Sequence, residues 1–431
     1  MIENAYINIW GKRVGAIHWN QDSGIADFEF DTGFFQHKLD VAPLKMPFGT
    51  ARGKIFSFPE LAGSSTYKGL PSLLADVLPD RYGNALINAW LARVGRPSGS
   101  MNPVEMLCFT GKRGMGALEF EPVVPKSADQ ATKVEIGSLA EVAQQILSGR
   151  QFFQTDLSHD EQKALSDILK IGTSAGGARA KAVIAYNPET GEVRSGQADA
   201  PKGFSQWLLK FDGVDDSQFG TSSGYGRVEM AYYLMAVDCG IEMMECRLFE
   251  ENERAHFLTR RFDRLPNNEK LHVQTFCAMM HYDFNDIYSY SYEQLFQTMR
   301  MLRLTYPEAE QMFRRMVFNV MAQNCDDHTK NFAFTMNQSG EWKLAPAYDI
   351  CHAYRPGSAW VSQHALSING KRQGITRDDL LEVGRQMNVK KAPAIISQVS
   401  EVVARWPEFA EQTKVDSELR DAIGKTLLII K

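Results

Sequence analysis

Three polar residues in the carboxyl-terminal half of the chain have the types and spacing that phosphoryl transfer requires. Asp326 and Asn331 are five positions apart, the same offset as the Asp and Asn of a kinase catalytic loop. Asp349 follows eighteen residues after Asn331. In such a site one carboxylate accepts the proton of the attacking hydroxyl, while the Asn and the other Asp hold Mg²⁺ against the phosphates. The spacing predicts a kinase-like site; a merely solvated helix end at Asp326 and Asp327 is the alternative.

The segments around this loop predict an ordered support for it. Apolar residues between Glu308 and Met321 recur at helical spacing and predict one buried stripe: Met312, Phe313, Met316, Val317, Val320 and Met321. After the loop, Phe332–Thr335 and Trp342–Leu344 predict a short hairpin with a turn at 337–340. A buried helix before the loop and a hairpin behind it would hold the three polar residues in place.

A glycine-rich segment lies upstream, at Ile171–Ala182. Glycines let backbone amides approach phosphate oxygens, and successive amides form an anion-binding nest. Lys181 adds positive charge there, and Lys181–Tyr186 predicts a strand. The segment is neither a Walker loop nor a dinucleotide fingerprint. A surface turn remains the alternative.

Lys210 is the next candidate phosphate ligand. The strand predicted over Ser205–Phe211 places Lys210 opposite an apolar face made of Trp207, Leu209 and Phe211. In kinases a strand Lys contacts the phosphates and pairs with a helix Glu. Glu229 is the available partner, at the start of a predicted helix that ends near Gly240. Its expected apolar face is Met230, Tyr233, Leu234 and Val237. The alternative for Lys210 is a surface lysine.

Together these motifs resemble the HipA-type serine/threonine kinase toxins of bacterial toxin–antitoxin modules. Five segments in the same order carry the resemblance: Ser174–Lys181, Leu208–Phe211, Arg260–Arg264, Asp326–Asn331 and Tyr348–Asp349. The family's amino-terminal domain is matched in Asn8–His18 and in Leu73–Leu91, which contains Leu-Pro-Asp-Arg-Tyr-Gly-Asn.

The resemblance implies an α+β, HipA-like kinase fold with mixed amino-terminal lobes, a largely helical carboxy-terminal lobe and nucleotide in the cleft. We expect a HipA-like amino-terminal domain over 1–125, a mixed lobe over 134–265 and a helical lobe over 266–431. Within the first, Gly83–Val94 predicts a helix with one apolar face: Leu86, Ile87, Trp90, Leu91 and Val94.

The resemblance also implies site roles. Asp326 would be the catalytic proton acceptor, because Asp327 fits the offset to Asn331 less well. Asn331 and Asp349 would hold Mg²⁺. Arg260–Phe262 would form the adenine hinge, mainly through backbone groups. The full nucleotide-binding set would be Gly176, Gly177, Ala178, Arg179, Lys181, Lys210, Arg260, Arg261, Phe262, His328, Lys330, Asn331, Tyr348 and Asp349.

Some assignments stay open. A hydrogen-bonded loop histidine is the alternative for His328. Ser174 matches the family's autophosphorylation site, but Thr173 beside it is a second acceptor. Arg179-Ala180 stands where some members carry Gln-Glu before the loop lysine, which could change how the loop closes.

The implied function is an ATP-dependent protein kinase toxin that arrests growth by phosphorylating a cellular protein, such as an aminoacyl-tRNA synthetase. Its implied partner is a helix-turn-helix antitoxin of HipB type bound to operator DNA. Two alternatives are a small-molecule kinase and an ATP-binding corepressor that acts only through a DNA-binding partner. The ordered motifs and the amino-terminal domain favour the protein kinase.

Composition agrees with this interpretation. The net charge of −5 argues against a generally basic nucleic-acid binder, although Arg260, Arg261 and Arg264 form a local basic cluster. The six cysteines are scattered and predict reduced, packed thiols; Cys325, beside Asp326, could also be reactive. We found neither a signal-peptide pattern nor a membrane-span-length apolar stretch, so we expect a soluble cytoplasmic protein without a membrane partner.

Overall fold

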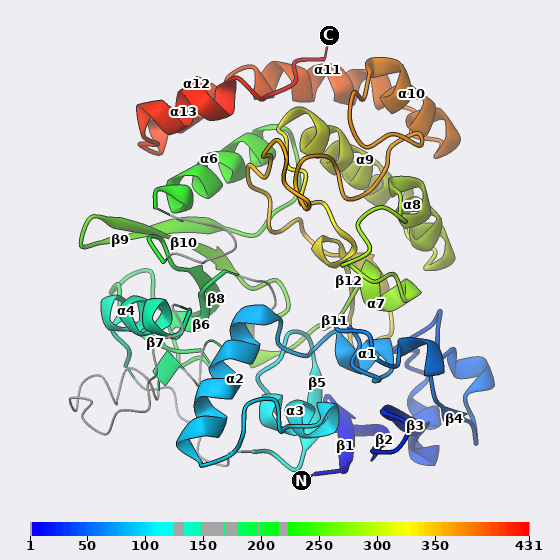
Figure 1. Ribbon diagram of the computed structural model, residues 1–431. Helices are drawn as coiled ribbons and strands as arrows, with labels where there is room; N and C mark the ends of the chain where they lie inside the picture. Colours follow the sequence, from blue (N-terminus) through cyan, green and yellow to red (C-terminus); the bar gives the residue numbers. More distant parts are fainter. Residues whose placement is uncertain are drawn as a thin grey trace.

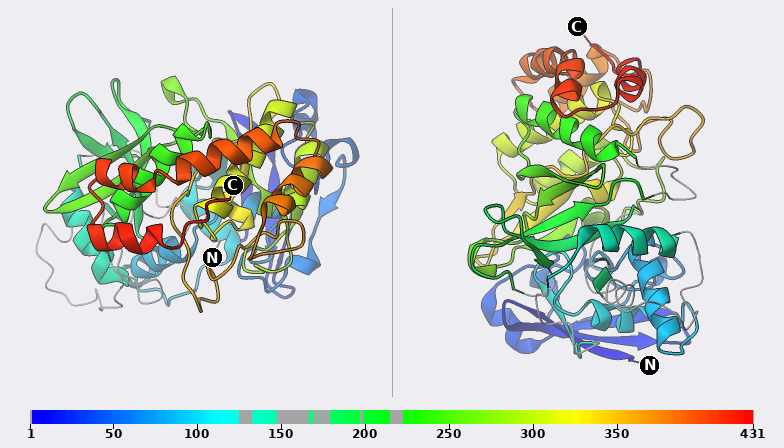
Figure 2. Two further views of the ribbon diagram at one scale, coloured as in Figure 1. Left: turned by 90° about the horizontal axis from the view of Figure 1, so that it is seen from above. Right: turned by 90° about the vertical axis from the view of Figure 1, so that its left-hand side faces the viewer.

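A computed structural model of the chain describes residues 2–124, 133–147, 167–168, 172, 179–196, 199–214 and 223–430. Three sheets follow one another along the chain, and the last third is mainly helical. The amino-terminal sheet lies at one end of the molecule and the last helices lie at the other (Figures 1 and 2). The predicted α+β architecture with a helical carboxy-terminal lobe is confirmed.

The amino-terminal domain is an antiparallel five-stranded sheet in the order β4-β3-β2-β1-β5, with three helices. Its strands are β1 Asn4–Ile9, β2 Lys12–Asn20, β3 Ile25–Phe30, β4 Ile55–Phe56 and β5 Leu118–Glu121. Its helices are α1 Ser72–Ala75, α2 Arg81–Arg93 and α3 Pro103–Thr110. Leu86, Ile87 and Leu91 of α2 are buried as expected, but Val94 lies just beyond the helix and is 50% exposed.

A second antiparallel sheet, in the order β7-β6-β8-β10-β9, forms the mixed lobe. Its strands are β6 Lys181–Tyr186, β7 Val193–Ser195, β8 Ser205–Lys210, β9 Cys246–Glu251 and β10 Arg254–Arg260. One face packs against α4 (Ile136–Leu147) in a core that includes the predicted apolar side of β8. Because side chains alternate along a strand, Lys210 faces the opposite side.

Helix α6 (Tyr225–Asp238) packs against β9 and β10. It begins four residues before the predicted start at Glu229. The expected apolar face was also wrong: Val237 is 45% exposed, while Glu229 is buried with Val228, Ala231, Tyr232, Met235 and Ala236. Gly226 explains the close approach, because a β-carbon there would lie 1.8 Å from the carbonyl oxygen of Ala255 in β10. Most positions of α6 are apolar, so periodicity alone could not select the buried face.

The helical lobe surrounds α9 (Tyr306–Met321). All six residues of the predicted stripe of α9 are fully buried, and the predicted hairpin is present. Its third sheet has the order β11-β12-β13, with β11 His272–Thr275, β12 Ala333–Met336 and β13 Trp342–Leu344. The other helices are α7 Phe276–Met280, α8 Tyr292–Met301, α10 Arg377–Gln386, α11 Ala392–Val403, α12 Trp406–Gln412 and α13 Ser417–Gly424.

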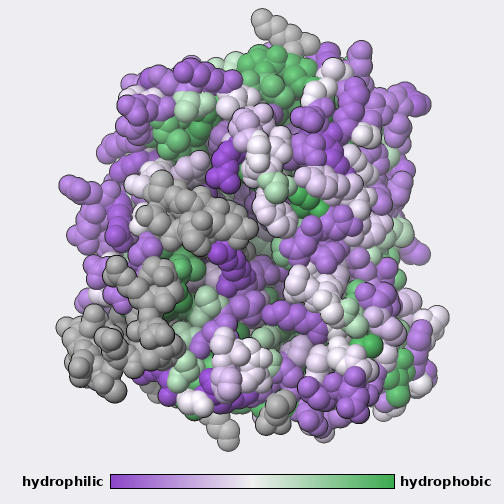
Figure 3. All heavy atoms as spheres, in the orientation of Figure 1, coloured by the Kyte–Doolittle hydropathy of each residue, from purple (hydrophilic) through white to green (hydrophobic). Residues whose placement is uncertain are grey.

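The surface and the cysteines complete the description. The face in Figure 3 carries mainly hydrophilic side chains, with apolar areas between them. Within the described ranges, none of the helices combines the length and the apolar character needed to cross a bilayer. Five of the six cysteines are buried and Cys351 is partly buried, as expected for packed thiols.

Candidate active site

The loop between α9 and β12 carries the predicted proton acceptor. Gln323 adopts a left-handed backbone conformation (φ 54°) just after α9, and the Cys325 amide donates to the carbonyl of Ala353 (3.1 Å). The Asp326 side chain is 48% exposed. Desolvation nevertheless raises its pKa, and His328 opposes this shift. The loop therefore presents an accessible carboxylate whose proton affinity is higher than that of an ordinary Asp.

Asp327, the neighbouring carboxylate, has a structural role. It is buried and accepts hydrogen bonds from the Tyr292 hydroxyl (2.8 Å), His364 Nδ1 (2.9 Å) and the Ala365 amide (2.7 Å). Burial alone would lower the pKa of His364, but Asp327 outweighs it and raises that pKa to about 10. Both oxygens of the buried Asp327 carboxylate thus already accept hydrogen bonds. This supports the choice of the more exposed Asp326 as proton acceptor.

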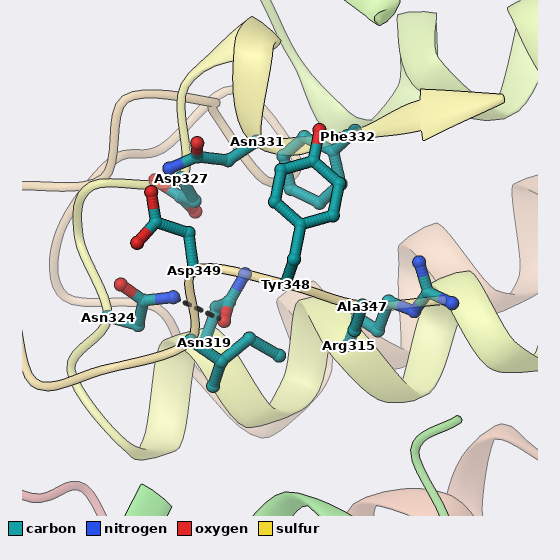
Figure 4. A pocket seen from close by; sticks show the side chains of 10 residues that line it. Arg315, Asn319, Asn324, Asp327, Asn331, Phe332, Ala347, Tyr348 and Asp349 are labelled. Atoms are coloured by element: carbon teal, nitrogen blue, oxygen red, sulfur yellow. Dashed lines mark hydrogen bonds between the residues drawn. The ribbon is translucent and has the colours of Figure 1, made fainter. Parts of the chain in front are cut away.

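Asn331 stabilises the loop and leaves an oxygen for a cation. Its Nδ2 donates to the carbonyl oxygen of Asp326 (2.7 Å). Asn331 and Asp349 both line a small cavity (Figure 4). Its volume is about 10 Å³, which is room for about one water molecule. Asn331 precedes β12 and Asp349 follows β13, and the antiparallel pairing of these strands brings the two predicted Mg²⁺ ligands to the same end of the hairpin.

Asp349 also meets two charged residues of the preceding lobe, and we call Lys210, Glu229 and Asp349 the cleft cluster. Lys210 Nζ contacts Glu229 Oε1 (2.5 Å) and pairs with Asp349 Oδ1. The Lys210–Glu229 pairing expected from sequence is present. Asp349 has a left-handed backbone (φ 55°), a strained conformation for a non-glycine residue. Such strain is typical of functional positions.

The charges of the cleft cluster suit a phosphate and metal site. Burial would raise the pKa of Asp349, but Lys210 and Lys181 more than offset it, so that carboxyl stays ionised. Lys181 is directly opposite Lys210 in the β6–β8 register, so both lysines lie on one face of the sheet. Two cations beside an ionised carboxylate can bind a Mg²⁺–phosphate group together.

The side chains at this cavity could supply part of a Mg²⁺ coordination shell. Asp349 and Asn331 offer carboxylate and amide oxygens, which Mg²⁺ prefers, with waters and phosphates completing its shell. Among the described residues no group of three or more His, Cys, Asp or Glu side chains could hold a metal by itself.

His328 and Lys330 flank the site without entering the cleft cluster. His328 Nδ1 accepts the Lys330 amide proton (3.3 Å), and its Nε2 lies 3.8 Å from Asp326 Oδ1. Lys330 Nζ pairs with Asp80 of the amino-terminal domain (2.6 Å). Its predicted contact with the triphosphate stays a prediction.

The proposed hinge divides into two parts. Phe262 stacks on Tyr348, with ring centroids 5.7 Å apart, and offers an aromatic surface of the kind that binds a base. Arg261 does not face this surface. Its amide donates to Gln206, and its guanidinium pairs with Asp263. A side-chain role for Arg261 in nucleotide binding is therefore not supported by its contacts.

Arg261, Asp263 and Arg264 form a second buried group, which we call the interface cluster. Asp263 bridges the two arginines at 2.7 and 2.6 Å and accepts from the Gly116 amide (2.7 Å). Both arginines also donate to the Gly114 carbonyl. Asp263 thus offsets part of the positive charge expected from sequence, and both guanidinium groups are buried away from solvent.

The glycine-rich segment is described only at its end. Thr173, Ser174, Gly176, Gly177 and Ala178 lie outside the described residues. Arg179 places its guanidinium over the ring of Tyr225, 4.9 Å from the centroid. It is close enough to lower the pKa of Asp326, whose net shift remains upward because desolvation dominates.

Comparisons with known proteins establish the family. Residues 173–406 match the family model described as HipA-like C-terminal domain, and residues 5–121 match that of the HipA N-terminal domain. The chain belongs to the HipA family. The resemblance inferred from its motifs is therefore confirmed. A search of curated proteins found no match.

The comparison with solved structures found a HipA protein and a kinase. HipA of Shewanella oneidensis MR-1, solved with HipB and its operator DNA, aligns at 16% identity and a TM-score of 0.65. The match covers 98% of this chain and 94% of that one. CtkA, a proinflammatory kinase of Helicobacter pylori, aligns at 13% identity over 58% of this chain and 92% of that one. Its TM-score of 0.34 is too low to support an argument.

Proposed function

We propose that this HipA-family protein is an ATP-dependent protein serine/threonine kinase and the toxin of a HipBA-like module. The main support is the facing arrangement of two groups. Asp326 and Asn331 lie on one loop, and Asp349 lies beside them in contact with Lys210 and its partner Glu229. Proton acceptance, cation binding and phosphate binding are thereby brought together, as phosphoryl transfer requires.

Each residue has a defined task in this mechanism. Asp326 accepts the proton of the attacking serine or threonine hydroxyl, and its raised pKa suits a general base. Lys210 and Lys181 would bind phosphate oxygens of ATP, and Asn331 and Asp349 would hold Mg²⁺. Held there, the cation would offset negative charge on the phosphates. The Phe262–Tyr348 pair provides a surface for the adenine.

The proposed partners and regulation follow from the family. We infer a HipB-type antitoxin on operator DNA, because HipA of Shewanella oneidensis MR-1 was solved in such a complex. An aminoacyl-tRNA synthetase is the proposed class of target. Phosphorylation at Ser174, with Thr173 as alternative, would add about −1.5 to −2 charges in the glycine-rich segment and repel the triphosphate.

Asp326→Asn tests the proposed function. The variant should lose transfer of the γ-phosphate from Mg-ATP about a hundredfold or more, because the proton acceptor is gone, while ATP binding changes little. Transfer of radiolabel to a target protein or to the chain itself is the assay. The same incubation, read by mass spectrometry, locates any modification at Ser174. Expression without the antitoxin should slow growth for the wild type only.

Asp378→Asn is the matched control, because Asp378 is an exposed residue of the same lobe. It should retain full transfer. Transfer near the wild-type rate by Asp326→Asn would reject the assignment of the base. Growth arrest by Asp326→Asn would favour a role through binding alone.

A further inference from the structure

Asp80 connects the amino-terminal domain to the catalytic loop. Its Oδ1 lies 2.6 Å from Lys330 Nζ, although the two residues are 250 positions apart. Both side chains are largely buried, with 19% of Asp80 and 13% of Lys330 exposed. A charge pair this close and this shielded is stronger than an exposed one.

The local structure directs Asp80 toward the loop rather than toward its own helix. Asp80 is the N-cap residue of α2, where an Asp side chain ordinarily accepts a bond from the first turn. Here the side chain makes no capping bond. The segment before it is held independently, because the Pro79 carbonyl accepts from Asn84 Nδ2 (3.0 Å).

Other lysines respond to the same carboxylate. Burial lowers the pKa of Lys181, and Asp349 and then Asp80 act in the opposite direction. Burial also lowers the pKa of Lys68, again opposed by Asp80. Asp80 therefore lies within electrostatic reach of a proposed phosphate ligand as well as in contact with Lys330.

Lys330 is well placed to transmit this contact to the site. It directly precedes Asn331, its amide donates to His328, and its carbonyl accepts the hydroxyl of Tyr348 (2.6 Å). Its ammonium also lies over the ring of Phe284, 4.6 Å from the centroid. Fixing Lys330 thus fixes the backbone that carries a proposed Mg²⁺ ligand.

We propose that Asp80 is a positioning residue of the phosphoryl-transfer site, through which the amino-terminal domain holds Lys330 and the segment His328–Asn331 in place. This inference rests on the proposed kinase function and extends it, because it gives the amino-terminal domain a part in catalysis.

The chain offers a matched control in Lys270 and Glu119. This pair has the same chemistry, joins the same two parts of the chain at 2.7 Å and is similarly shielded, with 17% and 25% exposed. Lys270 also donates to the carbonyl of Lys112 in the amino-terminal domain. Glu119→Gln therefore tests domain attachment without touching the catalytic loop.

The test compares Asp80→Asn with Glu119→Gln in the full-length protein. Asp80→Asn should lower kcat about tenfold or more, while KM for ATP stays the same or falls, because a negative charge near Lys181 is removed. Glu119→Gln should leave kcat within about twofold of wild type. Asp80→Glu should recover part of the loss. Equal loss of kcat in Asp80→Asn and Glu119→Gln, or wild-type kcat in Asp80→Asn, would overturn the proposal.

A double-mutant cycle with Lys330→Met separates this proposal from the proposed function. Unfolding midpoints of Asp80→Asn, Lys330→Met and the double variant should be non-additive, as expected for residues in direct contact. If the wild type transfers no phosphate but the cycle is non-additive, the kinase function fails, and with it the catalytic part of the proposal, while the coupling stands. An additive cycle rejects the coupling itself.

Discussion

The cleft cluster and the interface cluster contain the same types of charged residue but differ in their exposure to solvent. Each consists of carboxylate and cationic side chains in direct contact. In the interface cluster the side chains are at most 8% exposed, and the Gly114 carbonyl of the amino-terminal domain accepts further bonds from both arginines. In the cleft cluster Asp349 is 39% exposed and its backbone is strained. The two clusters therefore differ in solvent access and in backbone conformation, although their residue types are alike.

Breaking the interface cluster should have the largest effect. Asp263→Asn leaves two buried arginines without a full counter-charge, so the free energy of unfolding should fall by about 3–5 kcal/mol. Urea unfolding followed by circular dichroism measures this. Transfer activity per folded molecule should change little. The control is Glu382→Gln, which removes an exposed ion pair with Arg385 and should leave the unfolding midpoint unchanged. A stable Asp263→Asn variant without activity would reverse the roles of the two clusters.

Breaking the cleft cluster should reduce ligand binding and phosphate transfer rather than stability. Asp349→Asn removes a proposed Mg²⁺ ligand, so the Kd for Mg-ATP should rise and phosphate transfer should fall about a hundredfold. Calorimetric titration of ATP with and without Mg²⁺ measures the binding change. Glu229→Gln is the matched comparison, because it also removes a carboxylate from Lys210 but no cation ligand. The assignment fails if Asp349→Asn binds ATP with the Mg²⁺ dependence of the wild type.

The buried ion pair of His364 and Asp327 extends the comparison, because its contribution to stability depends on pH. The pKa of His364 is raised to about 10 in the folded protein by Asp327, against an ordinary value of 6.5. Protonated His364 therefore stabilises the folded protein. This contribution is complete below about pH 6.5 and is lost as pH rises through 10. The free energy of unfolding should fall by about 2–3 kcal/mol between pH 7 and pH 9. His364→Gln should flatten this dependence in urea titrations; an unchanged slope would exclude His364 as its source.

Local sequence patterns predicted the helices and strands near the site better than the contacts between distant segments. The stripe of α9, the hairpin β12–β13 and the apolar side of β8 follow from periodicity, because alternate or helical spacing sorts side chains onto faces. The buried face of α6 was predicted wrongly, because most positions of that helix are apolar and periodicity could not select one face. Asp263 and Asp80 were given no role, since each belongs to a contact that joins distant segments.

The sequence by itself determined the spacing of Asp326, Asn331 and Asp349 and the strand that carries Lys210, because these depend on short-range order along the chain. Tertiary structure decided which of two adjacent aspartates is available. Tyr292 and His364, from distant segments, bind Asp327 and leave Asp326 accessible. It also decided that Lys330 meets Asp80, because the free energy of burying a charge depends on which partner the fold brings to it.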